Sequence, residues 1–163
     1  MPRLIVMRHA TAGGSFGTAD SDRALTGRGQ RAAEAAAAWL RAAGAVPDHI
    51  VCSPATRARQ TLDRLALDTP AVFEPRVYRN DVDLLFDLIH ETRQEAKTLL
   101  LVGHNPSAHG LVLELTAGTE PRDFPAGALS VVDWRDGWPD AGPGRGTLVA
   151  VWTPVGRRLT AEA

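Results

Sequence analysis

The sequence predicts an α/β protein, a three-layer α/β/α sandwich whose central sheet is mostly parallel with an antiparallel edge. Short continuous apolar runs, which are typical of strands buried on both faces, alternate with helical patterns over residues 4–116. This alternation predicts parallel strands with helices on both faces of the sheet. Residues 128–134 and 147–153 form two strand-like runs joined by a Gly- and Pro-rich connection, which predicts the antiparallel pair.

The composition is that of an ordinary globular protein, and the length favours a single domain over residues 1–163. Hydrophobic residues make up 44% and charged residues 23% of the chain. The net charge of −1 gives no overall field that would attract nucleic acid or a membrane. The single cysteine, Cys52, excludes an internal disulfide, and we find neither a signal peptide nor a membrane-spanning run. We therefore expect a cytoplasmic protein.

The first strand, residues 4–7, runs directly into Arg8 and His9 and then into a polar loop over residues 11–24. In an open α/β sheet, ligands bind beyond the carboxyl ends of the strands. Arginine offers a planar, permanently charged fork for phosphate, and histidine can act as a nucleophile. The pair therefore suits an anion site, although a local surface ion pair would explain the same two residues.

A helix and a second strand follow this loop. Thr26 is a candidate N-cap, the alanine-rich residues 32–43 have high helix propensity, and Gly44 is placed to end the helix. His49–Cys52 predicts a short buried strand.

The next helix is predicted from a start pattern, because Ser53 suits an N-cap and Pro54 suits the first helical position. We expect this helix to run to about residue 67. Arg57 then lies in its first turn, beside the end of the second strand.

The later elements repeat the alternation. Ala71–Phe73 predicts a third strand, and either Asp81 or Asp83 opens a helix with a leucine-rich stripe. Residues 98–102 are the strongest strand of the chain, and a helix over Ser107–Thr116 follows them.

Three strand-to-helix junctions thus carry residues suited to phosphate chemistry. They hold the pair Arg8 and His9, then Arg57, and then His104 after the fourth strand. Because the carboxyl ends of parallel strands meet at one edge of a sheet, we expect these four side chains to surround one site.

The motifs at these junctions resemble those of the histidine phosphatase superfamily, whose fold is the phosphoglycerate mutase-like sandwich. The resemblance covers nearly the whole chain, in the family's order. Two segments are most similar to those of the SixA-like phosphohistidine phosphatases. They are Val102-Gly103-His104-Asn105-Pro106 and the late Pro125-Ala126-Gly127-Ala128. The other motifs that carry it are Met7-Arg8-His9-Ala10, Leu25-Thr26-x-x-Gly29 and Ser53-Pro54-x-x-Arg57-x-x-Gln60-Thr61.

The resemblance implies that His9 is the nucleophile, which becomes a phosphohistidine, and that Arg8, Arg57 and His104 form the phosphate pocket. Two guanidinium groups and an imidazole can neutralise a phosphoryl group without a metal or another cofactor. The neutral tautomer of His9 requires that its second N–H be held, and we expect a backbone carbonyl near Gly13 or elsewhere in the loop to accept it. Further candidates for substrate contacts, each of which also suits a capping or loop role, are Asn105, Thr11 and Ser15.

The general acid is the least defined part of the predicted site. Many ester phosphatases of the family carry a glutamate after the third strand, and residues 76–83 lack that motif. Asp81 and Asp83 are candidate acids, but both also suit helix capping. An alkoxide leaving group needs a proton, whereas the imidazole of a phosphohistidine can leave neutral. A missing acid therefore favours a P–N substrate.

The short interval between Arg57 and His104 leaves no room for the inserted lid of larger relatives. An open site suits a phosphorylated side chain of another protein, of the histidine-phosphotransfer type. The main hypothesis is therefore a metal-independent phosphatase of protein phosphohistidine. A phosphatase of small phosphoesters and a non-catalytic phosphoprotein-binding module remain as alternatives.

Overall fold

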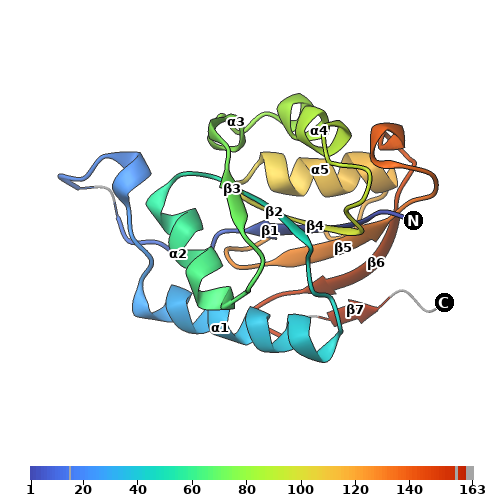
Figure 1. Cartoon of the computed structure of the whole chain (residues 1–163). Coiled ribbons are helices and arrows are strands. Elements are labelled where there is room, and N and C mark those ends of the chain that lie inside the picture. Colours follow the sequence, from blue (N-terminus) through green and yellow to red (C-terminus); the bar gives the residue numbers. More distant parts are fainter. Residues whose placement is uncertain (15, 157, 161–163) are drawn as a thin grey trace.

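The computed structural model describes residues 1–14, 16–156 and 158–160, and it confirms the predicted fold class. A mixed sheet of seven strands has the order β3-β2-β4-β1-β5-β6-β7 (Figure 1). The first four strands in this order are parallel, and the remaining three continue the sheet in antiparallel pairing. The strands are β1 (Arg3–Arg8), β2 (His49–Cys52), β3 (Ala71–Phe73), β4 (Thr98–Gly103), β5 (Leu129–Asp133), β6 (Thr147–Trp152) and β7 (Arg158–Thr160).

Helices cover both faces of the sheet (Figure 1). Helices α1 (Gly27–Ala42) and α2 (Thr56–Leu65) pack on one face. Helices α3 (Pro75–Tyr78), α4 (Val82–His90) and α5 (Ser107–Thr116) lie on the other face. Two short 3₁₀ turns, η1 (Asp20–Asp22) and η2 (Trp138–Asp140), complete the structure, and no helix in the described ranges is long and apolar enough to cross a membrane.

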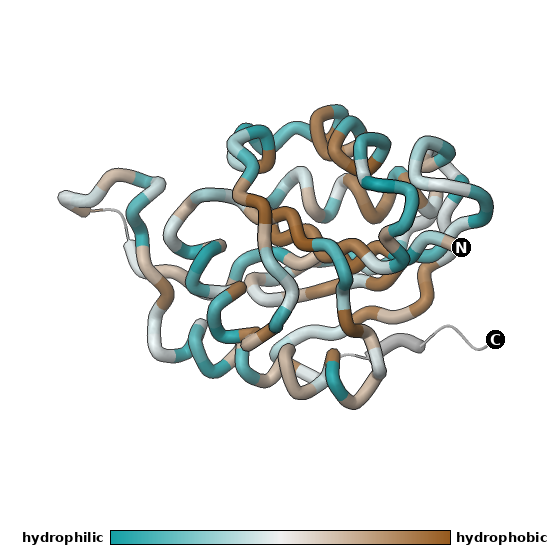
Figure 2. The backbone as a smooth tube through the Cα atoms, viewed as in Figure 1, coloured by the Kyte–Doolittle hydropathy of each residue, from teal (hydrophilic) through white to brown (hydrophobic). Residues whose placement is uncertain are grey.

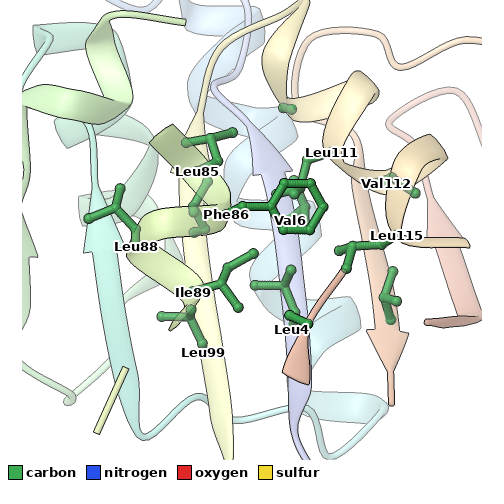
Figure 3. Close-up of a cluster of buried hydrophobic side chains, with 14 of the residues drawn as sticks. Leu4, Val6, Leu85, Phe86, Leu88, Ile89, Leu99, Leu111, Val112 and Leu115 are labelled. Carbon is green, nitrogen blue, oxygen red and sulfur yellow. The ribbon is translucent and has the colours of Figure 1, made fainter. Parts of the chain in front are cut away.

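The central strand β1 is buried on both faces, as its continuous apolar run predicts. Leu4 and Val6 face α4 and α5 (Figure 3), whereas Ile5 and Met7 face α1 and α2. All four side chains are fully buried, and the hydrophobic segments gather where the strands lie (Figure 2). Strand β1 therefore forms the rigid centre from which Arg8 and His9 extend.

The predicted start of α1 is confirmed, and that of α2 is wrong by two residues. The Thr26 hydroxyl accepts a hydrogen bond from the Gly29 amide at 3.1 Å, as an N-cap does. Helix α2 begins at Thr56 rather than at Pro54. The Ser53 hydroxyl accepts from the Ala55 amide at 3.2 Å and so holds a turn ahead of the helix.

Two elements were not predicted from the sequence. The single-turn helix α3 is too short to show a periodic pattern, and Glu74 caps it by accepting from the Arg76 amide. Strand β7 pairs with β6 beyond the last predicted strand.

Candidate active site

A cavity of about 340 Å³ opens where β1, β2 and β4 end. It brings together the four side chains that the sequence analysis placed at three separate junctions. The lining residues are Arg8, His9, Asp20, Arg23, Arg57, Tyr78, Asn80, His104 and Asn105.

His9 lies buried on the floor of this cavity with a defined tautomer. Its Nδ1 is 2.8 Å from the carbonyl oxygen of Ala10. Because a carbonyl can only accept, Nδ1 carries the proton and Nε2 keeps its lone pair. The carbonyl that holds His9 thus belongs to the adjacent residue, and not to Gly13 or a more distant part of the loop.

Burial, with smaller contributions from Arg57 and Arg8, lowers the pKa of His9 to about 4. The ring is therefore neutral at pH 7. The Nε of Arg57 donates to His9 Nε2 across 3.2 Å. The lone pair of His9 Nε2 thus accepts a hydrogen bond from Arg57.

His104 faces His9 across the floor, with 5.2 Å between the ring centroids. Its Nε2 lies 2.7 Å from the Ser53 hydroxyl, which fixes the orientation of the ring. Burial, with a smaller contribution from His9, lowers the pKa of His104 to about 3. A neutral ring that accepts the Ser53 hydroxyl proton at Nε2 presents an N–H at Nδ1.

Two buried nitrogens at this floor lack a hydrogen-bond partner among the described residues. They are Nδ1 of His104 and Nε of Arg8. Another nitrogen of Arg8, Nη1, donates to the carbonyl of Phe124 at 3.2 Å, which anchors the guanidinium. Unsatisfied buried donors are rare in folded proteins, and an oxyanion in the cavity would satisfy both.

Asp20 and Tyr78 form the outer part of the site, and the sequence analysis missed both. The Asp20 carboxylate accepts from Nη2 of Arg57 at 3.1 Å, from Arg23 at 3.1 Å and from the Tyr78 hydroxyl at 2.6 Å. Its backbone carbonyl accepts from Nη1 of Arg57 at 2.7 Å. The hydrogen bond from Tyr78, together with the arginines, lowers the pKa of Asp20 to about 2. The only sequence signal was an Asp and an Arg three positions apart ahead of Thr26.

Comparison with known proteins identifies the family of the chain. Residues 4–78 match the family model of the histidine phosphatase superfamily (branch 1). The phosphohistidine phosphatase SixA of Escherichia coli is 30% identical over 136 residues, which span 80% of this chain and 84% of that protein. The chain belongs to the histidine phosphatase superfamily. It is therefore a phosphatase by family, and its similarity to SixA proteins confirms the predicted resemblance.

Two further relatives extend over nearly all of this histidine phosphatase. An uncharacterized protein of Mycobacterium tuberculosis is 38% identical over 157 residues, covering 91% of this chain and 99% of the relative. A solved structure from Nakamurella multipartitia, provisionally assigned as a phosphohistidine phosphatase SixA, is 34% identical with a TM-score of 0.88. The match covers 95% of this chain and 97% of the Nakamurella chain. The whole fold is thus shared with SixA-type proteins.

Among the other predicted contact residues, only Asn105 borders the cavity. Its amide is already engaged, because Nδ2 donates to the Phe124 carbonyl at 2.8 Å and Oδ1 accepts from the His109 amide at 3.3 Å. Thr11 lies outside the cavity, where its carbonyl accepts from the Thr26 amide and hydroxyl. Ser15 lies outside the described residues.

The two candidate acids also lie outside the cavity lining. Asp81 is the N-cap of α4, and its carboxylate is held by the amide of Asp83 at 2.8 Å. Both side chains are exposed. The capping alternative thus describes Asp81, and the carboxylate that does reach the cavity is that of Asp20. No group of three or more metal-ligating side chains gathers in the described part of the chain.

Proposed function

We propose that this chain removes the phosphoryl group from phosphohistidine on a partner protein through a covalent phospho-His9 intermediate, without a metal. The observation that carries the proposal is the cavity floor, where the lone pair of His9 Nε2 lies beside the unsatisfied nitrogens of Arg8 and His104. Phosphoryl transfer requires an in-line nucleophile and neutralisation of the phosphoryl oxygens, and these groups supply both.

The first step begins when a phosphoryl oxygen replaces His9 Nε2 as the acceptor of the hydrogen bond from Arg57 Nε, which frees the lone pair of His9. Nε2 then attacks phosphorus from the floor, and the bond to the leaving group breaks on the opposite side, toward the cavity mouth. Arg8 and His104 donate to the other phosphoryl oxygens.

The second step uses water in place of the substrate. Water attacks the phosphorus of phospho-His9, and the P–Nε2 bond breaks with its electron pair returning to His9. Because the Ala10 carbonyl keeps the proton on Nδ1, His9 leaves as a neutral imidazole. Holding that proton therefore makes His9 a good leaving group as well as a nucleophile.

The character of the leaving group supports phosphohistidine as the substrate. Among the described residues that line the cavity, Asp20 is the only carboxylate, and its low pKa keeps it ionised. An alkoxide would find no proton donor of this kind, whereas an imidazole can leave without one. The half-exposed Asp20 and the exposed Tyr78 leave the mouth open to a side chain on another protein.

The test is to trap the intermediate with phosphoramidate or a phosphorylated histidine-phosphotransfer domain. Wild-type protein should carry an acid-labile phosphoryl group on His9 by mass spectrometry, and His9→Ala should carry none. His49→Ala, at the far end of β2, is the matched control and should be labelled normally. Unchanged labelling or hydrolysis in His9→Ala would disprove the covalent mechanism.

Comparison of substrates separates the alternatives. A higher kcat/KM for small phosphoesters than for phosphohistidine would favour an ester phosphatase on the same scaffold. Binding of phosphoprotein without labelling or turnover would identify a non-catalytic module.

A further inference from the structure

The Asp20 carboxylate lies at the exposed end of the cavity, whereas His9 is buried at the other end. The cavity runs from buried to exposed groups, since the Arg57 side chain is 8% exposed and that of Asp20 is 52% exposed. Arg57 spans the two ends, because its Nε contacts His9 Nε2 and its Nη2 contacts Asp20 Oδ2. A phosphoryl group on the floor therefore directs its leaving group toward Asp20.

The contacts of Asp20 leave it with acceptor capacity. Among the described residues, Oδ2 accepts from both Arg57 and Tyr78, whereas Oδ1 accepts from Arg23 alone. A carboxylate offers about four acceptor positions, so Oδ1 can accept one more hydrogen bond. The pKa of about 2 keeps the group ionised at neutral pH, which makes it an acceptor and not a proton donor.

We propose that Asp20 is a specificity-determining residue that selects an imidazole leaving group, a proposal that rests on the function proposed above. In a phosphoimidazole, the ring nitrogen that is not bonded to phosphorus points away from the phosphoryl group and toward the mouth. Asp20 Oδ1 accepts a hydrogen bond from this remote N–H. The bond stabilises the ring form that has taken a proton from solvent, and the carboxylate charge stabilises the resulting cation.

The protonated ring is the form that departs readily. As His9 Nε2 bonds to phosphorus, the P–N bond of the substrate breaks and its electron pair moves to the ring nitrogen. The remote N–H stays in place, so a neutral imidazole leaves. Without that proton an imidazolate anion would have to leave.

The same carboxylate opposes anionic leaving groups. An alkoxide or phenolate places negative charge at the mouth, where Asp20 is ionised and half exposed. One residue thus favours P–N substrates and disfavours P–O substrates, which is discrimination by both attraction and repulsion.

Kinetics of Asp20→Asn with phosphoimidazole and p-nitrophenyl phosphate test this assignment, because nitrophenolate leaves without a proton. The variant should lose roughly 10-fold in kcat/KM for phosphoimidazole, the typical value of a hydrogen bond to a charged group. Its kcat/KM for p-nitrophenyl phosphate should rise. Asp22→Asn, in the same turn and outside the cavity lining, should change neither. An equal loss on both substrates would overturn the proposal, because a residue that only positions Arg57 would act on both alike.

The pH profile gives a second readout. In Asp20→Asn the kcat for phosphoimidazole should fall from a lower pH than in the wild type, because the ring of the bound substrate loses its proton more easily. Asp20→Glu, which keeps the carboxylate, should restore part of the wild-type profile. Identical profiles in wild type and Asp20→Asn would overturn the role of Asp20 while leaving phospho-His9 intact. A failed proposed function would instead leave His9 unlabelled in all variants.

Discussion

At the scale of single residues, Thr61 joins the segment that holds His9 to the helix that carries Arg57. Its buried hydroxyl donates to the Arg57 carbonyl at 2.7 Å and accepts from the Ala10 amide at 3.0 Å. Ala10 in turn holds His9 through its carbonyl. The orientation of His9 thus depends on a hydroxyl that never touches the substrate.

Replacing Thr61 with valine should therefore destabilise the protein. The change keeps the volume but leaves the buried Ala10 amide without an acceptor, which costs about 1–3 kcal/mol of unfolding free energy. Urea denaturation measures the loss. Thr92→Val is the control, because the buried Thr92 hydroxyl donates only to the Leu88 carbonyl of its own helix. Equal losses in both variants would contradict the role assigned to Thr61.

Residues at strand ends could be predicted from the sequence, and those in the loop could not. Arg8, His9, Arg57 and His104 each follow a recognisable strand, and the parallel sheet brings strand ends together. Asp20 belongs to a loop without periodicity, so nothing in the sequence placed it against Arg57.

At the scale of elements, the first turn of α1 packs against the segment that follows His9, at Thr11. A Cβ at Gly29 would lie 2.1 Å from the Thr11 carbonyl oxygen, and this oxygen also accepts from the Thr26 amide at 3.0 Å. The Leu-Thr-x-x-Gly motif is therefore a packing motif, in which threonine caps the helix and glycine admits the neighbouring backbone.

Gly29→Ala should separate α1 from this segment and lower the unfolding free energy by about 2 kcal/mol or more. The rate of His9 labelling should fall with it, because Thr11 lies two residues from His9. Gly27→Ala is the matched control in the same turn. There the added Cβ meets only the flexible end of Arg31 at 3.3 Å, and alanine favours the helix. Thermal melts of the two variants measure the difference, and equal melting temperatures would exclude this packing role.

Helix starts could be predicted from the sequence where the N-cap side chain has no long-range partner. Thr26 and Asp81 cap their helices as their side chains allow. Ser53 looked like a third N-cap, but it also contacts His104, a partner more than 50 positions away. Such a long-range contact is invisible to local patterns and shifts the start of α2.

At the scale of the whole molecule, the buried neutral histidines make stability depend on pH. An unfolded histidine binds a proton near pH 6.5, whereas folded His9 and His104 do so only near 4 and 3. Between pH 6.5 and 4 the unfolded chain therefore binds more protons than the folded one. Their contribution to stability is complete above pH 6.5 and is lost as the pH falls through this window.

The unfolding free energy should accordingly fall by roughly 1–2 kcal/mol per pH unit within this window. Denaturation at a series of pH values measures the slope. His9→Gln should have a shallower slope, because the lowered pKa of His9 no longer contributes to it. A slope unaffected by His9→Gln would show that its pKa is not depressed.

The overall architecture was the most predictable level, because the apolar runs and their alternation involve many residues at once. Helices on both faces and the antiparallel edge follow from that pattern. Helix α3 is a single turn and too short to contribute to it, and strand β7 lies beyond the last predicted strand.

The central position of β1 determines how fast the backbone amides at the site exchange with solvent. The backbone amides of Arg8 and His9 donate to the carbonyls of Ala128 and Gly103, and both helical layers cover the strand. These amides can exchange with solvent only when the middle of the sheet opens, which links them to global unfolding. Asp20 belongs to η1, and the segment between β1 and α1 that holds η1 projects from the body (Figure 1). We therefore expect hydrogen exchange at the amides of Arg8 and His9 to be slower than at those of η1.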